Sequence, residues 1–103
     1  MKLINLTPHE VKITGYGTIP PSGTTARAHT NLSQIGEIDG IPLMVSRVVG
    51  MSNVPEEENG VLYIVPSFIR ELLPERRDLA SPAKLLRDDG GKIIGCGALE
   101  VNK

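Results

Sequence analysis

The sequence has few aromatic residues and almost no sulfur chemistry. It has no tryptophan, one phenylalanine, two tyrosines and a single cysteine, Cys96. One cysteine cannot form an intrachain disulfide, so we expect a chain that works in a reducing compartment. With so few aromatics, the core must rest on isoleucine, leucine and valine. The isoleucine and valine among these favour strands.

Long apolar runs and an excess of one charge are also missing. No stretch approaches the ~20 apolar residues of a transmembrane helix, and the opening residues break at Thr7-Pro8, short of a signal-peptide apolar region. The chain has 11 Lys and Arg against 12 Asp and Glu, so it lacks the basic surface that phosphate backbones require. We therefore expect a cytoplasmic protein with no membrane association, for which nucleic acid is a poor partner.

Glycine and proline are plentiful, and they divide the chain into short elements. The 103 residues include 11 glycines and 8 prolines spread along the sequence. They read as turns between elements of one domain, residues 1–103, and not as a linker. Alternating apolar residues predict strands over 2–6 and 10–14, joined by a turn at 7–10 into an antiparallel pair. A further strand of low hydrophobicity is predicted over 24–29.

The second half carries the clearest local signals. Asp39-Gly40 between two apolar runs predicts a type I′ hairpin, and the continuous apolar run at 61–65 predicts a strand buried on both faces. Ser67 is a candidate N-cap for a short helix over 67–73. Residues 75–91 look irregular and polar, and 92–101 form the last strand or strands.

These elements define a mostly-β (α+β) fold class. We expect six to eight short, mainly antiparallel strands around one short helix near 67–73. A partly closed barrel and a two-layer sheet both fit this pattern.

Several motifs, taken in order, resemble a known group of proteins. They are Asn5 to His9, the turn Pro21 to Gly23 with the following Arg27, the strand Tyr63 to Val65, and the pairs Arg77-Asp78 and Arg87-Asp88. This order resembles a family of small uncharacterised bacterial and phage proteins that open on an NLTPH-type motif. The resemblance covers nearly the whole chain. It implies a phage or prophage context, and it implies no substrate, because the family has no established activity.

His9 and the arginines are the candidate site residues. His9 is either a ligand-binding or general-base imidazole, or a turn residue whose ring caps the backbone. Arg77-Asp78 and Arg87-Asp88 are either two ion pairs that tie down the irregular segment, or parts of a pocket for an anionic small molecule floored by His9 and Arg27.

Other kinds of chemistry find little support. Cys96 lies in an apolar strand, where a thiol is usually inert, and no serine has a nucleophile-elbow setting. His9, His29 and Cys96 are the only soft ligands and show no metal-binding spacing, so we predict no metal site and no cofactor. The segment around Asp88-Asp89 reads as a hairpin turn.

Three functional hypotheses remain open. The first is a non-enzymatic binding domain of phage or prophage origin that binds an anionic small molecule or a host protein. The second is a structural or assembly protein that forms homo-oligomers. The third, which has the least support, is a hydrolase or nuclease that uses His9 with Asp78 or Asp88.

Overall fold

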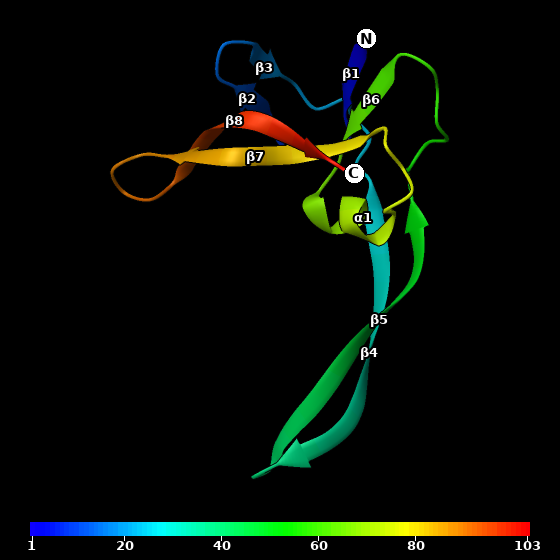
Figure 1. Cartoon of the computed structure of the whole chain (residues 1–103). Helices are drawn as coiled ribbons and strands as arrows, with labels where there is room; N and C mark the ends of the chain where they lie inside the picture. Colours follow the sequence, from blue (N-terminus) through cyan, green and yellow to red (C-terminus); the bar gives the residue numbers. More distant parts are fainter.

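The computed structural model describes residues 1–103 and contains eight strands and one helix (Figure 1). Six strands form one sheet in the order β1-β6-β7-β8-β2-β3, and two form a separate hairpin, β4-β5. The two outermost strands of the sheet, β1 and β3, lie close together, so the sheet is nearly closed into a barrel. The elements are β1 (Lys2–Asn5), β2 (Val11–Ile13), β3 (Gly17–Ile19), β4 (Arg27–Ile38), β5 (Ile41–Ser52), β6 (Val61–Ile64), α1 (Ser67–Leu72), β7 (Leu79–Arg87) and β8 (Ile93–Val101). The expected mostly-β fold with one short helix is confirmed.

The first two strands do not pair with each other. β1 runs parallel to β6, and β2 runs parallel to β8 and antiparallel to β3. The prediction of an antiparallel pair joined at residues 7–10 is therefore wrong. The corner carries the chain from one edge of the sheet to a strand near the opposite edge. Local alternation shows that two segments are strands but not which strands they pair with.

β6 is buried on both faces, as its continuous apolar run predicts. Its alternate side chains serve two clusters. Val61 and Tyr63 join the cluster packed with Ile69 of α1, whereas Ile64 joins Val11 and others on the other face. Burial on both faces fixes β6 between β1 and β7.

Two local predictions need correction. Pro66, not Ser67, is the N-cap residue of α1, and no side chain caps this end. The segment predicted to be irregular forms β7 up to Arg87, which pairs antiparallel with β8. Pro82 is unfavourable inside a strand, and Lys84 has a positive φ of 51°. Local sequence rules therefore do not predict a strand here. The long ladder with β8 overrides those local preferences.

The Asp39-Gly40 hairpin forms as predicted, but it is much longer than the local signal indicates. Asp39 and Gly40 have φ of 50° and 79°, the positive values that a type I′ turn requires. Ile38 pairs with Ile41, and the pairing continues to Arg27 and Ser52. The hairpin projects from the body as an arm (Figure 1). We call residues 27–52 the arm.

Candidate functional site

The corner at residues 5–9 is held by the side chain of Asn5. Its Oδ1 accepts hydrogen bonds from the backbone N–H and the hydroxyl of Thr7, at 2.9 and 2.7 Å. Its Nδ2 donates to the carbonyls of His9 and Ile19, at 2.8 and 3.1 Å. Ile19 ends β3, so the last of these bonds crosses the seam between the outermost strands. Asn5 is 1 % exposed and closes the sheet while shaping the corner.

The side chain of His9 makes none of the hydrogen bonds that hold the corner. Its backbone carbonyl accepts hydrogen bonds from Asn5 and Thr7, while the residue itself is exposed. The structural role of the motif therefore rests on Asn5 and Thr7. The sequence feature that could have indicated this role is an asparagine two residues before a Thr-Pro dipeptide. Such an asparagine can form an Asx turn, as Asn5 does with the N–H of Thr7.

Asp78 is paired with Arg76. One interpretation of the arginines expected an ion pair between Arg77 and Asp78, and that expectation is wrong. The Arg76 guanidinium donates from Nε and Nη2 to the two oxygens of Asp78, both at 2.8 Å, and Nη2 also donates to the carbonyl of Pro55 at 2.7 Å. The hydrogen bond from Arg76 lowers the pKa of Asp78, against the opposing effect of burial. The same bond raises the pKa of Arg76. This fork ties the 53–60 loop to the start of β7, and Arg77 is left exposed.

Arg87 and Asp88 lie at the turn between β7 and β8, and they form no ion pair with each other. Arg87 Nη1 donates to the carbonyl of Gly91 at 3.1 Å, and Asp88 Oδ1 accepts from the backbone N–H groups of Gly90 and Lys92 at 2.9 and 3.0 Å. Asp88 is thus a turn residue, as the hairpin interpretation predicted. Arg27 is exposed at the base of the arm.

Two further polar residues matter to the architecture, and the sequence interpretation misplaced or missed them. Arg70 was not singled out as a site residue; it lies in α1, is 7 % exposed and donates to Ser81 and Asn102 at 2.9 and 3.0 Å. Asn102 Nδ2 donates to the carbonyls of Arg70, Leu73 and Arg76. It adds a side-chain donor to carbonyls at and beyond the end of α1, where the carbonyls of Arg70 and Leu73 also accept backbone hydrogen bonds. Nothing local in the sequence marks Asn102.

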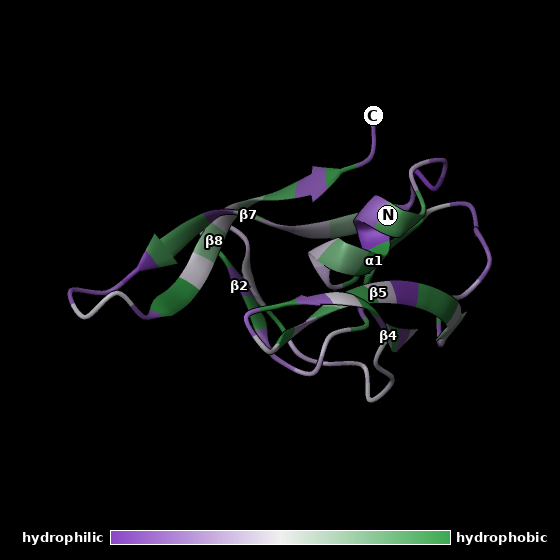
Figure 2. Ribbon diagram, turned by 90° about the horizontal axis from the view of Figure 1, so that it is seen from below, coloured by the Kyte–Doolittle hydropathy of each residue, from purple (hydrophilic) through white to green (hydrophobic).

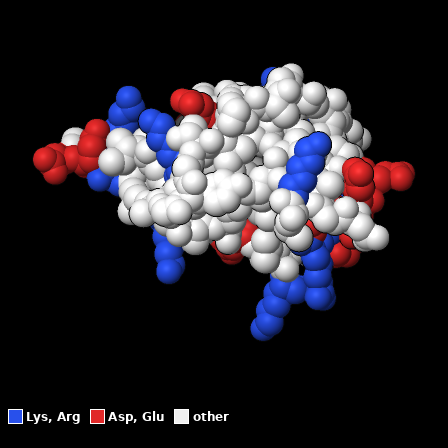
Figure 3. Space-filling view, turned by 90° about the horizontal axis from the view of Figure 1, so that it is seen from above, with Lys and Arg blue, Asp and Glu red and all other residues white.

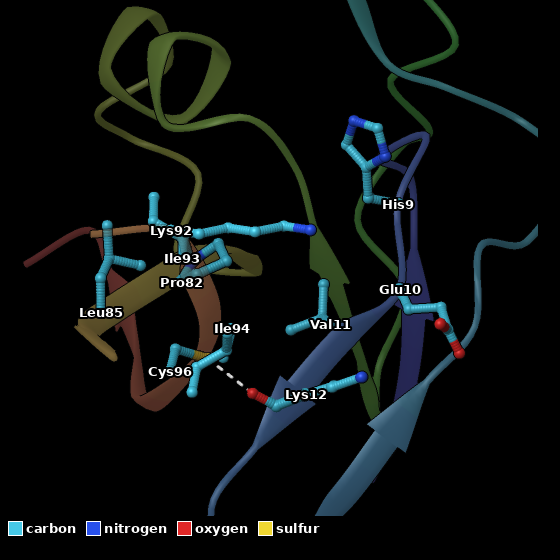
Figure 4. A pocket seen from close by; sticks show the side chains of 11 residues that line it. His9, Glu10, Val11, Lys12, Pro82, Leu85, Lys92, Ile93, Ile94 and Cys96 are labelled. Carbon is cyan, nitrogen blue, oxygen red and sulfur yellow. Dashed lines mark hydrogen bonds between the residues drawn. The ribbon is translucent and has the colours of Figure 1, made fainter. Parts of the chain in front are cut away.

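A cavity lies between β2 and the β7-β8 hairpin, next to the corner (Figure 4). Its volume is about 750 Å³, and it is open to solvent. Of the six predicted site residues, only His9 lines it; Arg27, Arg77, Asp78, Arg87 and Asp88 do not. Two lysines that the sequence interpretation did not single out, Lys12 and Lys92, line it together with His9 and Glu10. The expected floor of His9 and Arg27 is therefore not formed in this cavity.

The arm is the most prominent apolar surface. Its exposed apolar side chains have exposed fractions from 39 to 69 % and are Leu32, Ile35, Ile38, Ile41, Leu43, Met44, Val48 and Val49. Figure 2 shows apolar segments along β5 and towards the outer end of the β7-β8 hairpin. Because partners across the hairpin share a face, the register places Met44 and Val48 on the face of Leu32, and Leu43 on the face of Ile38 and Ile41. Both faces of the arm are therefore partly apolar.

Charge is distributed more evenly than apolar surface. Figure 3 shows Lys and Arg scattered around the edge of one face, interspersed with Asp and Glu and without a patch of one sign. No helix is long and apolar enough to cross a membrane. No group of three His, Cys, Asp or Glu side chains is positioned to hold a metal ion.

The fold and the exposed surfaces define a small, nearly closed β sheet that carries a projecting hairpin arm. No protein-family model, curated protein or solved structure matches the chain.

Proposed function

We propose that this is a non-enzymatic assembly protein of the phage or prophage type, whose arm pairs with the arm of a second copy. The observation that carries the proposal is the uncovered apolar arm. An isolated two-stranded hairpin is marginally stable in water and needs a third strand or a packed face. Beyond its base, this arm has neither within the chain.

The arm also lacks most of the features that protect edge strands. Each strand has twelve residues and one free edge, because the arm is a two-stranded sheet. Exposed edges are usually protected by proline, lysine or a covering element. β5 has Pro42 near the turn, whereas β4 has neither proline nor lysine. The free edge of β4 is therefore the better template for another strand.

The energy available from covering the arm supports a stable contact. Its eight exposed apolar residues average about 56 % exposed. Full burial of such a side chain contributes about 1.5–3 kcal/mol, so covering all of their exposed parts on both faces would contribute on the order of 10 kcal/mol per chain, of which pairing of the β4 edges covers a part. Two chains gain their covered parts together, against a cost of association of about 4–15 kcal/mol. A contact between two arms can therefore be favourable overall.

The charges of β4 favour a second copy over an unrelated partner. β4 has one basic residue near its start, Arg27, and one acidic residue near its end, Glu37. In an antiparallel pair of β4 strands centred on Leu32, the basic end of each strand lies beside the acidic end of the other. The irregularity between Gln34 and Gly36 puts Arg27 and Glu37 on opposite faces, so the two charges lie near one another without forming a directly opposed pair. Such a two-fold contact is self-complementary, as a symmetric dimer requires.

Charge reversal tests this arrangement. Arg27→Glu and Glu37→Lys each bring like-charged strand ends together at two symmetric positions, and the double variant restores opposite charges. Cross-strand charge interactions contribute about 0.2–1 kcal/mol each, so each single variant should raise the dimer dissociation constant about twofold to thirtyfold. Sedimentation equilibrium measures this constant, and Glu58→Lys, an exposed change in the 53–60 loop, is the control for net charge.

Two results would overturn the proposal. One is a strictly monomeric parent protein at high micromolar concentration. The other is a double variant that associates no better than the single variants, which would indicate that a different surface or a different protein covers the arm. Leu32→Asp provides a second measurement, because at the centre of the pair it places two carboxylates together and should abolish association.

A further inference from the structure

The cavity beside the corner combines an apolar floor with a cationic rim. Its floor includes Val11, Ile93 and Ile94, and its rim includes Lys12 and Lys92. A volume of about 750 Å³ lies within the range of small-molecule sites, which are mostly apolar with a few polar groups. The cavity lies outside the arm, so it requires its own explanation.

The basic groups of the cavity have no internal partner. Four ion-pair contacts form in the molecule, and all involve Arg70 or Arg76. The ammonium groups of Lys12 and Lys92 are therefore not neutralised by a carboxylate of the chain. Figure 4 shows Lys92 extending across the cavity from the β7-β8 side towards β2, with His9 on the far wall.

Glu10 is the one acidic group that lines the cavity. In Figure 4 its carboxylate points away from Lys92, on the outer side of β2. In Figure 4 the Lys12 side chain also points away from Lys92, on the same side of β2 as Glu10, so the cavity presents the Lys92 ammonium and the His9 imidazole. An anion gains from the Lys92 ammonium there, while an apolar body gains from leaving water on the floor.

We propose that this cavity binds an amphipathic anion: a molecule with an aromatic or other apolar body that rests on Val11 and Ile94, and a phosphate, sulfonate or carboxylate that faces Lys92. The imidazole of His9 lies on the wall towards which Lys92 extends and can donate a hydrogen bond to that group. This assigns His9 a role in binding and not in catalysis.

Three probes separate the two parts of the proposed ligand. Phenyl phosphate has both an apolar ring and an anion, inorganic phosphate has the anion alone, and benzyl alcohol has the ring without the charge. Titrations followed by amide chemical shifts should show the tightest binding for phenyl phosphate, with shifts concentrated at residues 9–12 and 92–96. Equal binding of benzyl alcohol would overturn the proposal, as would shifts confined to the arm.

Substitutions test which groups are responsible. Lys92→Gln removes the ammonium group of the cavity, and we expect at least a tenfold weaker affinity for phenyl phosphate and unchanged binding of benzyl alcohol. The matched control is Lys2→Gln, which removes the same charge from an exposed position outside the cavity. An affinity that falls equally in both variants would reflect net charge alone and would overturn the site.

Discussion

Replacing Asn5 should destabilise the protein far more than replacing the neighbouring His9. Asn5 is 1 % exposed and makes four hydrogen bonds, two as donor and two as acceptor. Asn5→Ala leaves the carbonyl of Ile19 and the N–H of Thr7 without these partners. A buried polar group that loses its partner costs about 1–3 kcal/mol, so we expect a total loss of about 3–5 kcal/mol.

That loss is a large share of the free energy of unfolding of a domain of this size. Domains of this size have about 5–15 kcal/mol of unfolding free energy. With a urea slope of about 1–3 kcal/mol per molar, the unfolding midpoint should fall by about 2 M. Circular dichroism in urea measures this fall, at protein concentrations low enough that association does not raise the apparent stability.

Two further variants isolate the cause. Asn5→Asp keeps the two acceptors but removes both donors and sets a carboxylate against two carbonyls, so it should cost at least as much as Asn5→Ala. His9→Ala should change the free energy of unfolding by less than about 0.5 kcal/mol, the usual range for exposed positions. A loss below about 1 kcal/mol for Asn5→Ala, or an equal loss for His9→Ala, would refute this account of the corner.

Three other outcomes follow from the packing. The pKa of Asp78 is lowered in the folded state by its bond to Arg76, so its stabilisation is present above the ordinary value of about 3.9 and is lost as pH falls through the lower folded pKa. Urea unfolding between pH 6 and 2 should show a smaller loss in Arg76→Met than in the parent protein. A β-carbon at Gly95 would lie 3.1 Å from the carbonyl of Lys12, so Gly95→Ala should lower the thermal midpoint by several degrees in a melting scan. Cys96 is 2 % exposed, so a thiol reagent should modify it only in denaturant; rapid modification of the folded protein would contradict this.

The features predicted correctly from the sequence are those that short segments determine. The turn at Asp39-Gly40 follows from residues that adopt positive φ, and the buried strand at 61–65 follows from its continuous apolar run. The turn at Asp88 follows from an aspartate before two glycines. In each case the physical cause lies within a few residues, so no partner strand had to be known.

The features that were missed depend on contacts between distant segments. The pairing of β1 with β6 joins residues nearly 60 positions apart, and no local pattern records it. The Arg76-Asp78 pair does not follow from strand alternation either, because Arg77 and Asp78 lie in a turn before β7 and not in an extended strand.

The arm has the composition of a core but contributes to the core only at its base, where Ala28 and Met51 pack against the main buried cluster. Eleven of its 26 residues are apolar, about the 40 % share of the whole chain, yet none of the buried hydrophobic residues lies within it. An element adapted to water would carry many charges on its exposed faces; this one has four, at Arg27, Glu37, Asp39 and Arg47.

The overall dimensions support the same conclusion. The radius of gyration is 16.5 Å, against about 13 Å for a compact chain of this length. The excess reflects the projection of the arm away from the sheet (Figure 1). A sequence that keeps core-like residues on an extended element gains from them only when something covers that element. We therefore infer that the cover comes from outside the chain. The self-complementary charges of β4 are the reason to propose a second copy as that cover.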